Sequence, residues 1–244
     1  MSYPQITDVF GRANQGVFAP FKCGASDGKS YFVKGTGSGI RGLVCEFVCG
    51  RLAQILKLPV PPFKILESSK ALVENSLVPG INELGSDLAF GSTAIKGAKE
   101  LTYTRLNVPS ADLQQRILVF DWWTRNEDRH LTRLGGNPNM IMDSSEEKLY
   151  IIDHHSAFDP YFNVANFSSS HAFSHHKNFF SREDFQNRHR VLLLGALANL
   201  DSIINDIPPP WLDYLDEGHE NFDIDEIRRT LNNVSHPDSW VIAP

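Results

Sequence analysis

A polar run at residues 126–130 (Asn-Glu-Asp-Arg-His) follows an apolar stretch and contains side chains suited to phosphoryl transfer. It is followed by Asn137-Pro138-Asn139 ahead of an apolar run, and then by residues 150–153 (Tyr-Ile-Ile-Asp). Transfer of a phosphoryl group to a hydroxyl needs a carboxylate that accepts the proton and oxygen ligands that hold magnesium against the phosphates. Each residue alone could simply cap a helix or end a strand. Their order along the chain favours the catalytic interpretation.

A second candidate group lies in the first half of the chain, where Lys34 ends the β-rich run 30–34 and Glu46 follows in a helical run. A lysine directed into a nucleotide cleft binds phosphates when a carboxylate holds its ammonium in place. Glu46 is the natural partner of Lys34. The pair alone would more simply be a solvated strand end and a polar helix face, but the run around Asp128 favours the functional interpretation.

Apolar periodicity and turn residues predict the elements that position these side chains. Strands are predicted over 6–10, 17–22, 30–34, 63–66, 71–74 and 88–95, with a turn at 24–28, and an amphipathic helix over 40–57 that Pro59 stops. After residue 100 helices are predicted over 111–125, 185–205 and 227–232, the last behind a capping box at 223–226, with strands over 139–142 and 148–152 and a long loop over 159–180. Trp122 and Trp123 are expected in the core. The pattern predicts two lobes with a cleft between them, an N-lobe over 1–100 and a C-lobe over 101–244.

Composition and charge exclude several classes of protein. The chain has 244 residues and a formal net charge of −6, without the basic face or tail typical of nucleic-acid binders. Its longest apolar run, residues 191–200, is about half the length of a membrane-spanning helix, so no membrane span is expected. Residues 1–5 lack the features of a signal peptide. Three cysteines without a CxxC spacing favour free thiols in the cytoplasm.

The sequence resembles the HipA-like kinases, which share the architecture of protein kinases and phosphatidylinositol kinases. The likeness covers residues 12–160 well and is faint beyond them. It is carried by Tyr31-Phe32-Val33-Lys34, Cys45-Glu46, Arg51-Leu52-Ala53, Leu58-Pro59-Val60-Pro61-Pro62, Phe90-Gly91-Ser92, residues 126–130 and Ile152-Asp153-His154, with fainter echoes at Ile207-Pro208 and Trp211.

This resemblance implies a two-lobed, kinase-like α+β fold with a strand-rich N-lobe, one main N-lobe helix and a mainly helical C-lobe. It implies an ATP- and Mg²⁺-dependent kinase in which Asp128 is the catalytic base, Asn139 and Asp153 are magnesium ligands, and Lys34 paired with Glu46 binds the ATP phosphates. A protein Ser or Thr is the expected acceptor, because HipA-like kinases are known as toxins that act on translation factors. A small molecule or a lipid headgroup stays open as the acceptor, and so does the oligomeric state.

The sequence departs from the family pattern at two places. The metal Asn normally stands five residues after the catalytic Asp, whereas position 133 is Arg and Asn139 comes eleven residues after Asp128. Residues 134–136 therefore resemble part of an insertion, and Asn139 is preferred to Asn137 because it directly precedes the strand 140–142. The phosphate loop is weakly marked. The loop 11–16, with Gly16 as the candidate nucleotide contact, lies between two strands, and the richer glycine run 35–39 follows Lys34.

Three other interpretations compete with this one. Asp153-His154-His155 is similar to the Asp-His-His signature of two-metal phosphoesterases, although the first 100 residues lack the Asp-x-Asp pair that such enzymes also need. The histidines at 171, 175 and 176 could bind a metal, but their polar surroundings favour a solvated loop. The kinase fold could also serve as a catalytically silent binding module.

Overall fold

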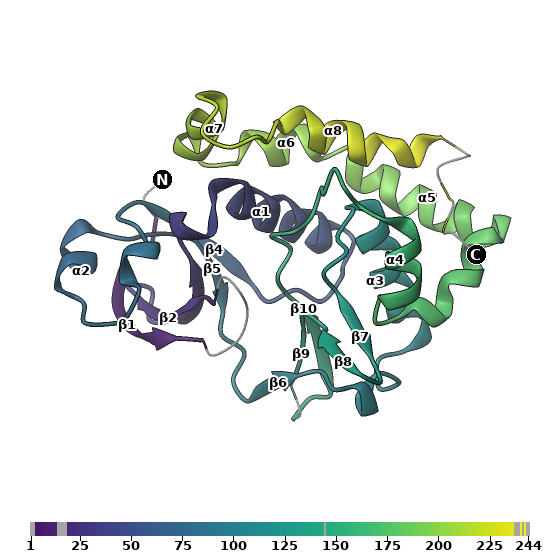
Figure 1. The fold of residues 1–244 in the computed structure, drawn as a ribbon, viewed down its shortest axis with the longest axis horizontal. Coiled ribbons are helices and arrows are strands. Elements are labelled where there is room, and N and C mark those ends of the chain that lie inside the picture. The colour runs from purple at the N-terminus through teal and green to yellow at the C-terminus, as the bar shows by residue number, and fades with distance from the viewer. Residues whose placement is uncertain (1–2, 14–18, 144, 237–239, 241, 243–244) are drawn as a thin grey trace.

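The N-terminal part of the protein is built on a five-stranded antiparallel sheet. In the computed structural model, which describes residues 3–13, 19–143, 145–236, 240 and 242, the strand order is β1-β2-β3-β5-β4 (Figure 1). The strands are β1 (Ile6–Arg12), β2 (Phe21–Ala25), β3 (Ser30–Lys34), β4 (Phe63–Glu67) and β5 (Leu88–Thr93). The strands predicted on either side of the turn at 24–28 do form a hairpin, β2–β3, but the first, predicted over 17–22, begins only at Phe21, and residues 17 and 18 lie outside the described residues. Its first strand includes Gly24 and Ala25, which were expected in the turn, because Gly24 pairs with both Asp8 and Ser30.

The predicted strand over residues 71–74 is wrong, because helix α2 (Lys70–Asn75) occupies this segment. Ser69 caps the helix by accepting a hydrogen bond from the backbone amide of Leu72 at 3.1 Å. Capping of this kind stabilises a short helix against the β propensity of its apolar residues. Two 3-10 segments, η2 (Ile81–Glu83) and η3 (Tyr103–Arg105), flank β5 and the short strand β6 (Ala98–Glu100).

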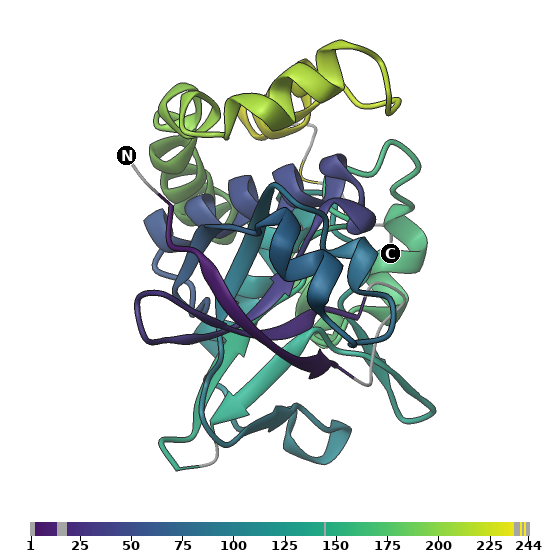
Figure 2. The same ribbon diagram turned by 90° about the vertical axis from the view of Figure 1, so that its left-hand side faces the viewer.

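Helix α1 (Ile40–Ile55) packs between the sheet and the C-terminal helices. It contacts β5 together with α5, α6 and α7, and Figures 1 and 2 show it enclosed by these layers. Twelve of its sixteen residues are buried, so the predicted amphipathic character is wrong. A helix covered on opposite sides is apolar nearly all round. Consequently Glu46, in the middle of α1, is buried as well.

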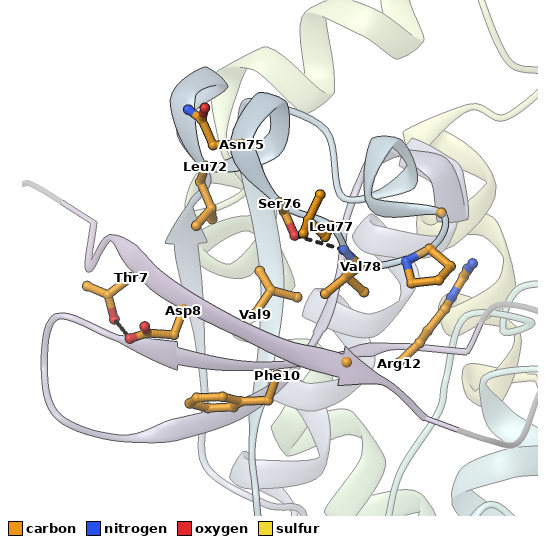
Figure 3. A pocket seen from close by; sticks show the side chains of 13 residues that line it. Thr7, Asp8, Val9, Phe10, Arg12, Leu72, Asn75, Ser76, Leu77 and Val78 are labelled. Atoms are coloured by element: carbon orange, nitrogen blue, oxygen red, sulfur yellow. Dashed lines mark hydrogen bonds between the residues drawn. The ribbon is translucent and has the colours of Figure 1, made fainter.

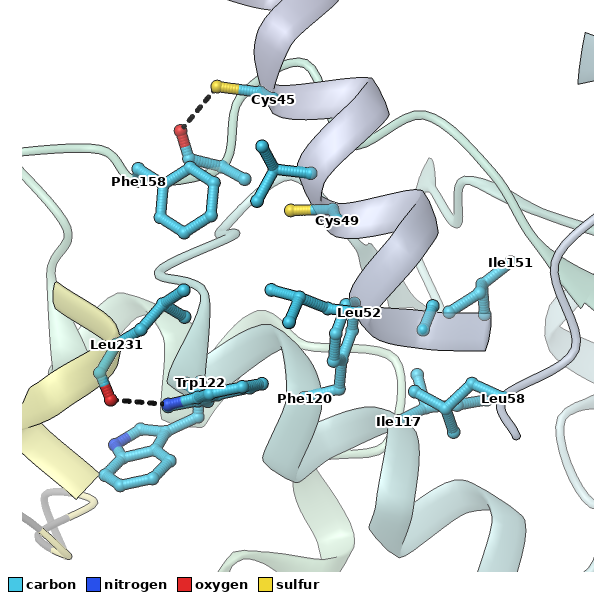
Figure 4. Close-up of a cluster of buried hydrophobic side chains, with 14 of the residues drawn as sticks. Cys45, Cys49, Leu52, Leu58, Ile117, Phe120, Trp122, Ile151, Phe158 and Leu231 are labelled. Carbon is cyan, nitrogen blue, oxygen red and sulfur yellow. Dashed lines mark hydrogen bonds between the residues drawn. The ribbon is translucent and has the colours of Figure 1, made fainter. Parts of the chain in front are cut away.

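Helix α3 (Ala111–Trp123) carries the main core of the second half. Ser110 caps it by accepting a hydrogen bond from the amide of Leu113 at 3.3 Å. Side chains of α1 and α3 meet in one apolar cluster with Ile151 and Leu231 (Figure 4). Trp122 and Trp123 are buried there, as predicted. The core is therefore continuous between the N-terminal and C-terminal halves, and a smaller cluster lies beneath β1, β2 and β3.

Two small sheets follow α3 and place the candidate residues around Asp128. Strands β9 (Met140–Asp143) and β10 (Lys148–Ile151) confirm the predicted pair and form a sheet with β6 in the order β10-β9-β6. Strands β7 (His130–Thr132) and β8 (Gly135–Asn137) form a hairpin that was not predicted. Both strands are only three residues long, and β8 contains two glycines, so neither carries a periodic signal from which it could be predicted.

The C-terminal part is more helical than predicted. The expected loop over 159–180 contains helix α4 (Val164–Ser170), capped by the Asn163 side chain, and the 3-10 helix η4 (Ser174–Ser181). The single helix expected over 185–205 is two, α5 (Glu183–Leu197) and α6 (Leu200–Asn205). Helices α7 (Pro209–Asp216) and α8 (Ile224–Asn232) and the segment η5 (Asn233–Ser235) complete the described chain.

The predicted cap of α8 is confirmed at Asp223, whose carboxylate accepts a hydrogen bond from the amide of Asp225 at 2.8 Å. The second carboxylate of the predicted capping box, that of Glu226, instead accepts a hydrogen bond from Arg229 at 3.0 Å. No single helix among the described residues is long and apolar enough to span a membrane. Only the segments Glu183–Asn205 and Pro209–Asp216, which are bent by 87° relative to each other, reach that length and apolar composition when taken together.

Candidate active site

Buried Lys34 and Glu46 and half-buried Asp153 form an ion cluster where the end of β3, helix α1 and the end of β10 meet. The Lys34 Nζ atom lies 2.6 Å from Glu46 Oε1 and 2.7 Å from Asp153 Oδ1. Glu46 Oε2 also accepts a hydrogen bond from the backbone amide of His154 at 3.0 Å. The structure thus brings together the lysine and the carboxylate that the sequence paired. It adds Asp153 as a second partner of the same ammonium.

The protonation states of this cluster follow from burial and charge together. Burial raises the pKa of the Glu46 carboxyl, but the Lys34 ammonium and the His154 contacts outweigh it and hold the pKa at about 2. Burial acts in the same direction on Asp153, and Lys34 and His155 again outweigh it, so its pKa lies well below the ordinary range. The Lys34 pKa is raised, because the two carboxylates outweigh the effect of burial. All three groups are therefore charged at neutral pH.

Asp128 and Asn139 lie in direct contact although eleven residues separate them. The Asn139 Nδ2 atom donates to Asp128 Oδ2 at 3.0 Å and to the Asp128 carbonyl at 3.1 Å. Asn137 makes a longer contact, 3.5 Å, from its Nδ2 atom to Asp128 Oδ2. The β7–β8 hairpin contains residues 134–136 and returns the chain to Asp128. This hairpin explains the unusual spacing between Asp128 and Asn139.

Arg129 connects the backbone of both candidate metal ligands to helix α3. Its guanidinium donates to the carbonyls of Asn139 and Ile152, the latter at 3.3 Å. The same guanidinium contacts Asp121 Oδ2 at 2.7 Å through Nε, and neither Arg129 nor Asp121 is exposed to solvent. This pair was not predicted from the sequence. The available signal was a carboxylate within an otherwise apolar helix face, which requires a buried partner.

The histidines of the 159–180 segment are structural, and the prediction of a solvated loop is wrong for two of them. His171 Nε2 lies 3.0 Å from Asp121 Oδ2, and His171 Nδ1 accepts a hydrogen bond from the amide of Phe173 at 3.0 Å. Burial lowers the pKa of His171, although Asp121 opposes this effect. His176 is buried too and contacts Gln114 Oε1 at 3.1 Å. In the described part of the chain, no three His, Cys, Asp or Glu side chains gather as a metal-binding group.

His154 and His155 do not form the pair that the phosphoesterase interpretation requires. The His154 ring is buried and packs edge-on against Phe120, with ring centroids 5.9 Å apart. His155 Nδ1 instead contacts Asp153 Oδ1 at 2.6 Å. The two rings therefore have different surroundings, and His154 serves the contact between α1 and α3.

A cavity of about 330 Å³ lies beside the ion cluster and is walled by both halves of the chain. Lys34, Glu46, Asn137, Asn139 and Asp153 all line it. The rest of its wall is mainly apolar. The apolar residues come from β3, β4, β5, β9 and β10 and from the β1–β2 and α1–β4 connections. They include Ala13, Pro20, Phe32, Val60, Pro61, Phe63, Phe90, Met140, Ile141, Ile151 and Ile152. A mostly apolar cavity lined by a few charged groups is the usual form of a small-molecule site.

The two glycine-rich segments lie in different places relative to this cavity. Ala13 and Pro20, at the described ends of the β1–β2 connection, line it and are joined by a hydrogen bond of 2.9 Å from Ala13 N to Pro20 O. Gly16 itself lies outside the described residues. The run 35–39 instead packs against η2, where a Cβ atom at Gly35 would lie 1.9 Å from the carbonyl oxygen of Leu84. The glycines of this run allow that close approach.

A larger and more open groove, about 1000 Å³, lies between β1 and the segment that follows α2 (Figure 3). Phe10 and Leu77 are exposed along it, and Arg12 at its end pairs with Glu83. Lys34, Glu46, Asn139 and Asp153 do not line this groove. These four residues line the smaller cavity instead, whereas Asp128 lines neither.

Comparisons with known proteins agree with this geometry. The sequence matches the family model described as HipA-like kinase over residues 6–243. The fold is similar to a crystal structure of a Helicobacter pylori proinflammatory kinase, CtkA, with 12% identity, a TM-score of 0.54 and coverage of 98% of this chain and 95% of that chain. The FAT and kinase domain of CtTel1 gives 12% identity, a TM-score of 0.24 and coverage of 98% of this chain and 24% of that chain. No curated protein matches significantly. The predicted kinase-like fold is thereby confirmed, and the chain belongs to the HipA-like kinase family.

Proposed function

We propose that this kinase uses ATP and Mg²⁺ to phosphorylate a hydroxyl group, with a protein Ser or Thr as the acceptor. The observation that carries the proposal is the Lys34 ammonium between Glu46 and Asp153 at the wall of an apolar cavity. Kinases hold ATP phosphates with a lysine fixed by a helix glutamate and bind magnesium through an aspartate and an asparagine. The same residue types lie together in this protein.

The nucleotide is assigned to the cavity between the two halves, with residues 1–100 as the nucleotide-binding lobe and 101–244 as the catalytic lobe. The apolar wall, which includes Phe32, Phe63 and Ile151, suits the face of a purine base. Lys34, which lines the cavity together with Glu46 and Asp153, suits the phosphates. The β1–β2 connection, with Gly16, is the better candidate for the phosphate loop, because its described ends line the cavity whereas the run 35–39 packs against η2.

Asn139 and Asp153 fit a magnesium ion by the chemistry of their donor atoms. Magnesium prefers oxygen ligands and takes one or two from the protein. Asn139 uses its Nδ2 atom to bind Asp128, which leaves its amide oxygen for a cation. Lys34 and His155 both contact Oδ1 of Asp153, which leaves Oδ2. When bound, the ion would neutralise charge on the phosphates.

Asp128 is proposed as the base that accepts the proton of the acceptor hydroxyl. Its side chain is 30% exposed, so an acceptor can reach it from solvent. The hydrogen bond from Asn139 Nδ2 to Oδ2 fixes the carboxylate, and Oδ1, which lies 4.0 Å from His130 Nδ1, is the oxygen proposed to meet the incoming hydroxyl. Positioned bases of this kind contribute about 10²–10⁴-fold to rate.

Family membership supports the protein acceptor, and the free state of Cys23, Cys45 and Cys49 supports a cytoplasmic site of action. Incubation with labelled ATP and Mg²⁺, with and without lysate of the source organism, tests the proposal. We expect a labelled protein band that is lost in Asp128→Asn. A labelled small molecule would change the acceptor class, and nucleotide binding without any transfer would favour the silent binding module.

A further inference from the structure

Helix α1, which carries Glu46, is capped by a side chain from the other end of the protein. Its N-cap residue is Gly39, with φ 79° and ψ 138°, and its first turn contains no acidic residue. The first amides of a helix lack partners within the helix and carry partial positive charge. Here Glu220 Oε1 accepts a hydrogen bond from Ile40 N at 2.7 Å, and Oε2 accepts one from Arg41 N at 2.9 Å. A carboxylate 180 residues away in sequence therefore completes this helix end.

Arg41 ties the same turn of α1 to two further segments. Its Nη1 atom donates to the carbonyl of His155 at 3.2 Å, and its Nη2 atom donates to that of Ala157 at 2.8 Å. Its guanidinium also lies over the Phe222 ring, 5.1 Å from the centroid. The start of α1 is thus joined to the chain that follows Asp153 and to the α7–α8 connection, which contains Glu220 and Phe222.

These contacts determine where Glu46 lies. Glu46 follows Ile40 by six residues, about 9 Å along the helix axis at 1.5 Å per residue. Apolar packing against α5, α6 and α7 holds α1 against its neighbours. The two charge-assisted hydrogen bonds at the first turn add a directional constraint on the rotation and axial position of the helix. The Lys34–Glu46 separation of 2.6 Å leaves no room for the helix to slide without breaking the pair.

We propose that Glu220 is a positioning residue, which holds α1 and thereby Glu46 in the arrangement that pairs with Lys34. The effect on catalysis rests on the proposed function, in which the Lys34–Glu46 pair binds ATP phosphates. Loss of Glu220 lets α1 shift, so that Glu46 separates from Lys34 and the lysine no longer has a fixed position. Kinase activity depends on this pair being in place.

Hydrogen–deuterium exchange of nucleotide-free protein tests the hold on α1 directly. A cap of this kind is worth about tenfold in a local opening equilibrium, so Glu220→Ala should accelerate exchange of residues 40–46 by about that factor. Glu220→Gln should give a smaller increase, because it keeps an acceptor and loses the charge. Glu217→Ala is the matched control, since Glu217 is a nearby acid that is 68% exposed and contacts His219. Unchanged exchange in Glu220→Ala would overturn the proposal, whether or not the protein turns over ATP.

A double-mutant cycle then tests the link to the site. Glu220→Ala should lower kcat/KM for ATP by about tenfold in the wild-type background and should have no further effect in a Glu46→Gln background, because it acts through Glu46. An equal loss in both backgrounds would overturn the proposal, since it would indicate general destabilisation. Absence of turnover in the wild type would count against the proposed function alone, and the exchange result would then decide the role of Glu220.

Discussion

Replacement of Lys34 by methionine tests the ion cluster independently of any catalytic activity. The Lys34 side chain is 8% exposed and that of Glu46 is 4% exposed, so the pair is screened little by solvent. Methionine keeps most of the apolar length of lysine and removes the charge. Loss of one partner from a buried ion pair destabilises a protein by about 3–5 kcal/mol, because the remaining charge is uncompensated. At about 2–4 °C per kcal/mol for a chain of this size, the Tm should fall by roughly 6–20 °C.

The contribution of Glu46 to the pH dependence of stability should also change sign in this variant. In the wild type, burial raises the pKa of Glu46 but Lys34 outweighs it and holds the pKa at about 2, below the ordinary 4.5. The pair therefore contributes stability above pH 4.5, which is lost as the pH falls towards 2. Burial is the largest effect on Glu46 and raises its pKa, so without Lys34 we expect the Glu46 pKa to lie above its ordinary value. The folded state should then bind more protons than the unfolded state above pH 4.5, so Lys34→Met should lose stability relative to the wild type as the pH rises.

Thermal unfolding at pH 5 and pH 7 measures both effects. Lys64→Met is the matched control, because Lys64 Nζ contacts Asp27 Oδ2 at 2.8 Å but its side chain is 46% exposed. An exposed pair contributes about 0.2–1 kcal/mol, so the control should lose at most a few degrees. The reasoning is refuted by a Tm loss in Lys34→Met no larger than in Lys64→Met. It is refuted equally if the change in stability from pH 5 to pH 7 is no less favourable in Lys34→Met than in the wild type, since the buried histidines contribute the same change to both proteins.

Three further experiments examine the catalytic residues and their support. Asp128→Asn should keep the fold and the affinity for ATP and reduce turnover by about 10²–10⁴-fold; turnover at the wild-type rate would remove Asp128 from the site. In calorimetry with Mn²⁺ and a non-hydrolysable ATP analogue, Asn139→Ala should abolish nucleotide-linked metal binding and Asn137→Ala should leave it intact; the reverse result would assign the ligand to Asn137. Arg129→Leu should lower the free energy of unfolding by about 3–5 kcal/mol in chemical denaturation, because Asp121 loses its buried partner; a loss below about 1 kcal/mol would contradict the central role given to Arg129.

Local sequence patterns were sufficient to predict the elements that carry the ion cluster. Lys34 ends a strand whose β-rich run is readable in isolation, and β3 has the predicted bounds. Glu46 lies in a helix with a clear start after glycine and a clear stop before proline. The same patterns failed where tertiary contacts decide. The burial of α1 on opposite sides depends on helices more than 100 residues later in the chain, and no local signal reports them.

The buried polar contacts around the site could not be predicted from the sequence, for a different reason. His171 and Asp121 are 50 residues apart and meet only because α4 and the following turn pack against α3. The polar composition of the 159–180 segment favoured a solvated loop. In the structure, hydrogen-bond partners offset the cost of burying two of its histidines: Asp121 for His171 and Gln114 for His176. A buried polar side chain cannot be told from an exposed one by residue type when its partner lies far away in sequence.

The backbone at the two candidate metal ligands explains why Arg129 is buried where it is. Asn139 has φ 45° and Asp153 has φ 58°, a left-handed conformation that is unfavourable for residues other than glycine, although Asn and Asp tolerate it best. Such positions persist only when their surroundings over-determine them. Arg129 donates to the carbonyls of Asn139 and of Ile152, which precedes Asp153, and Asp121 holds the guanidinium in place. One buried arginine thereby fixes both strained turns relative to α3, so that Asn139 and Asp153 are oriented before any ligand binds.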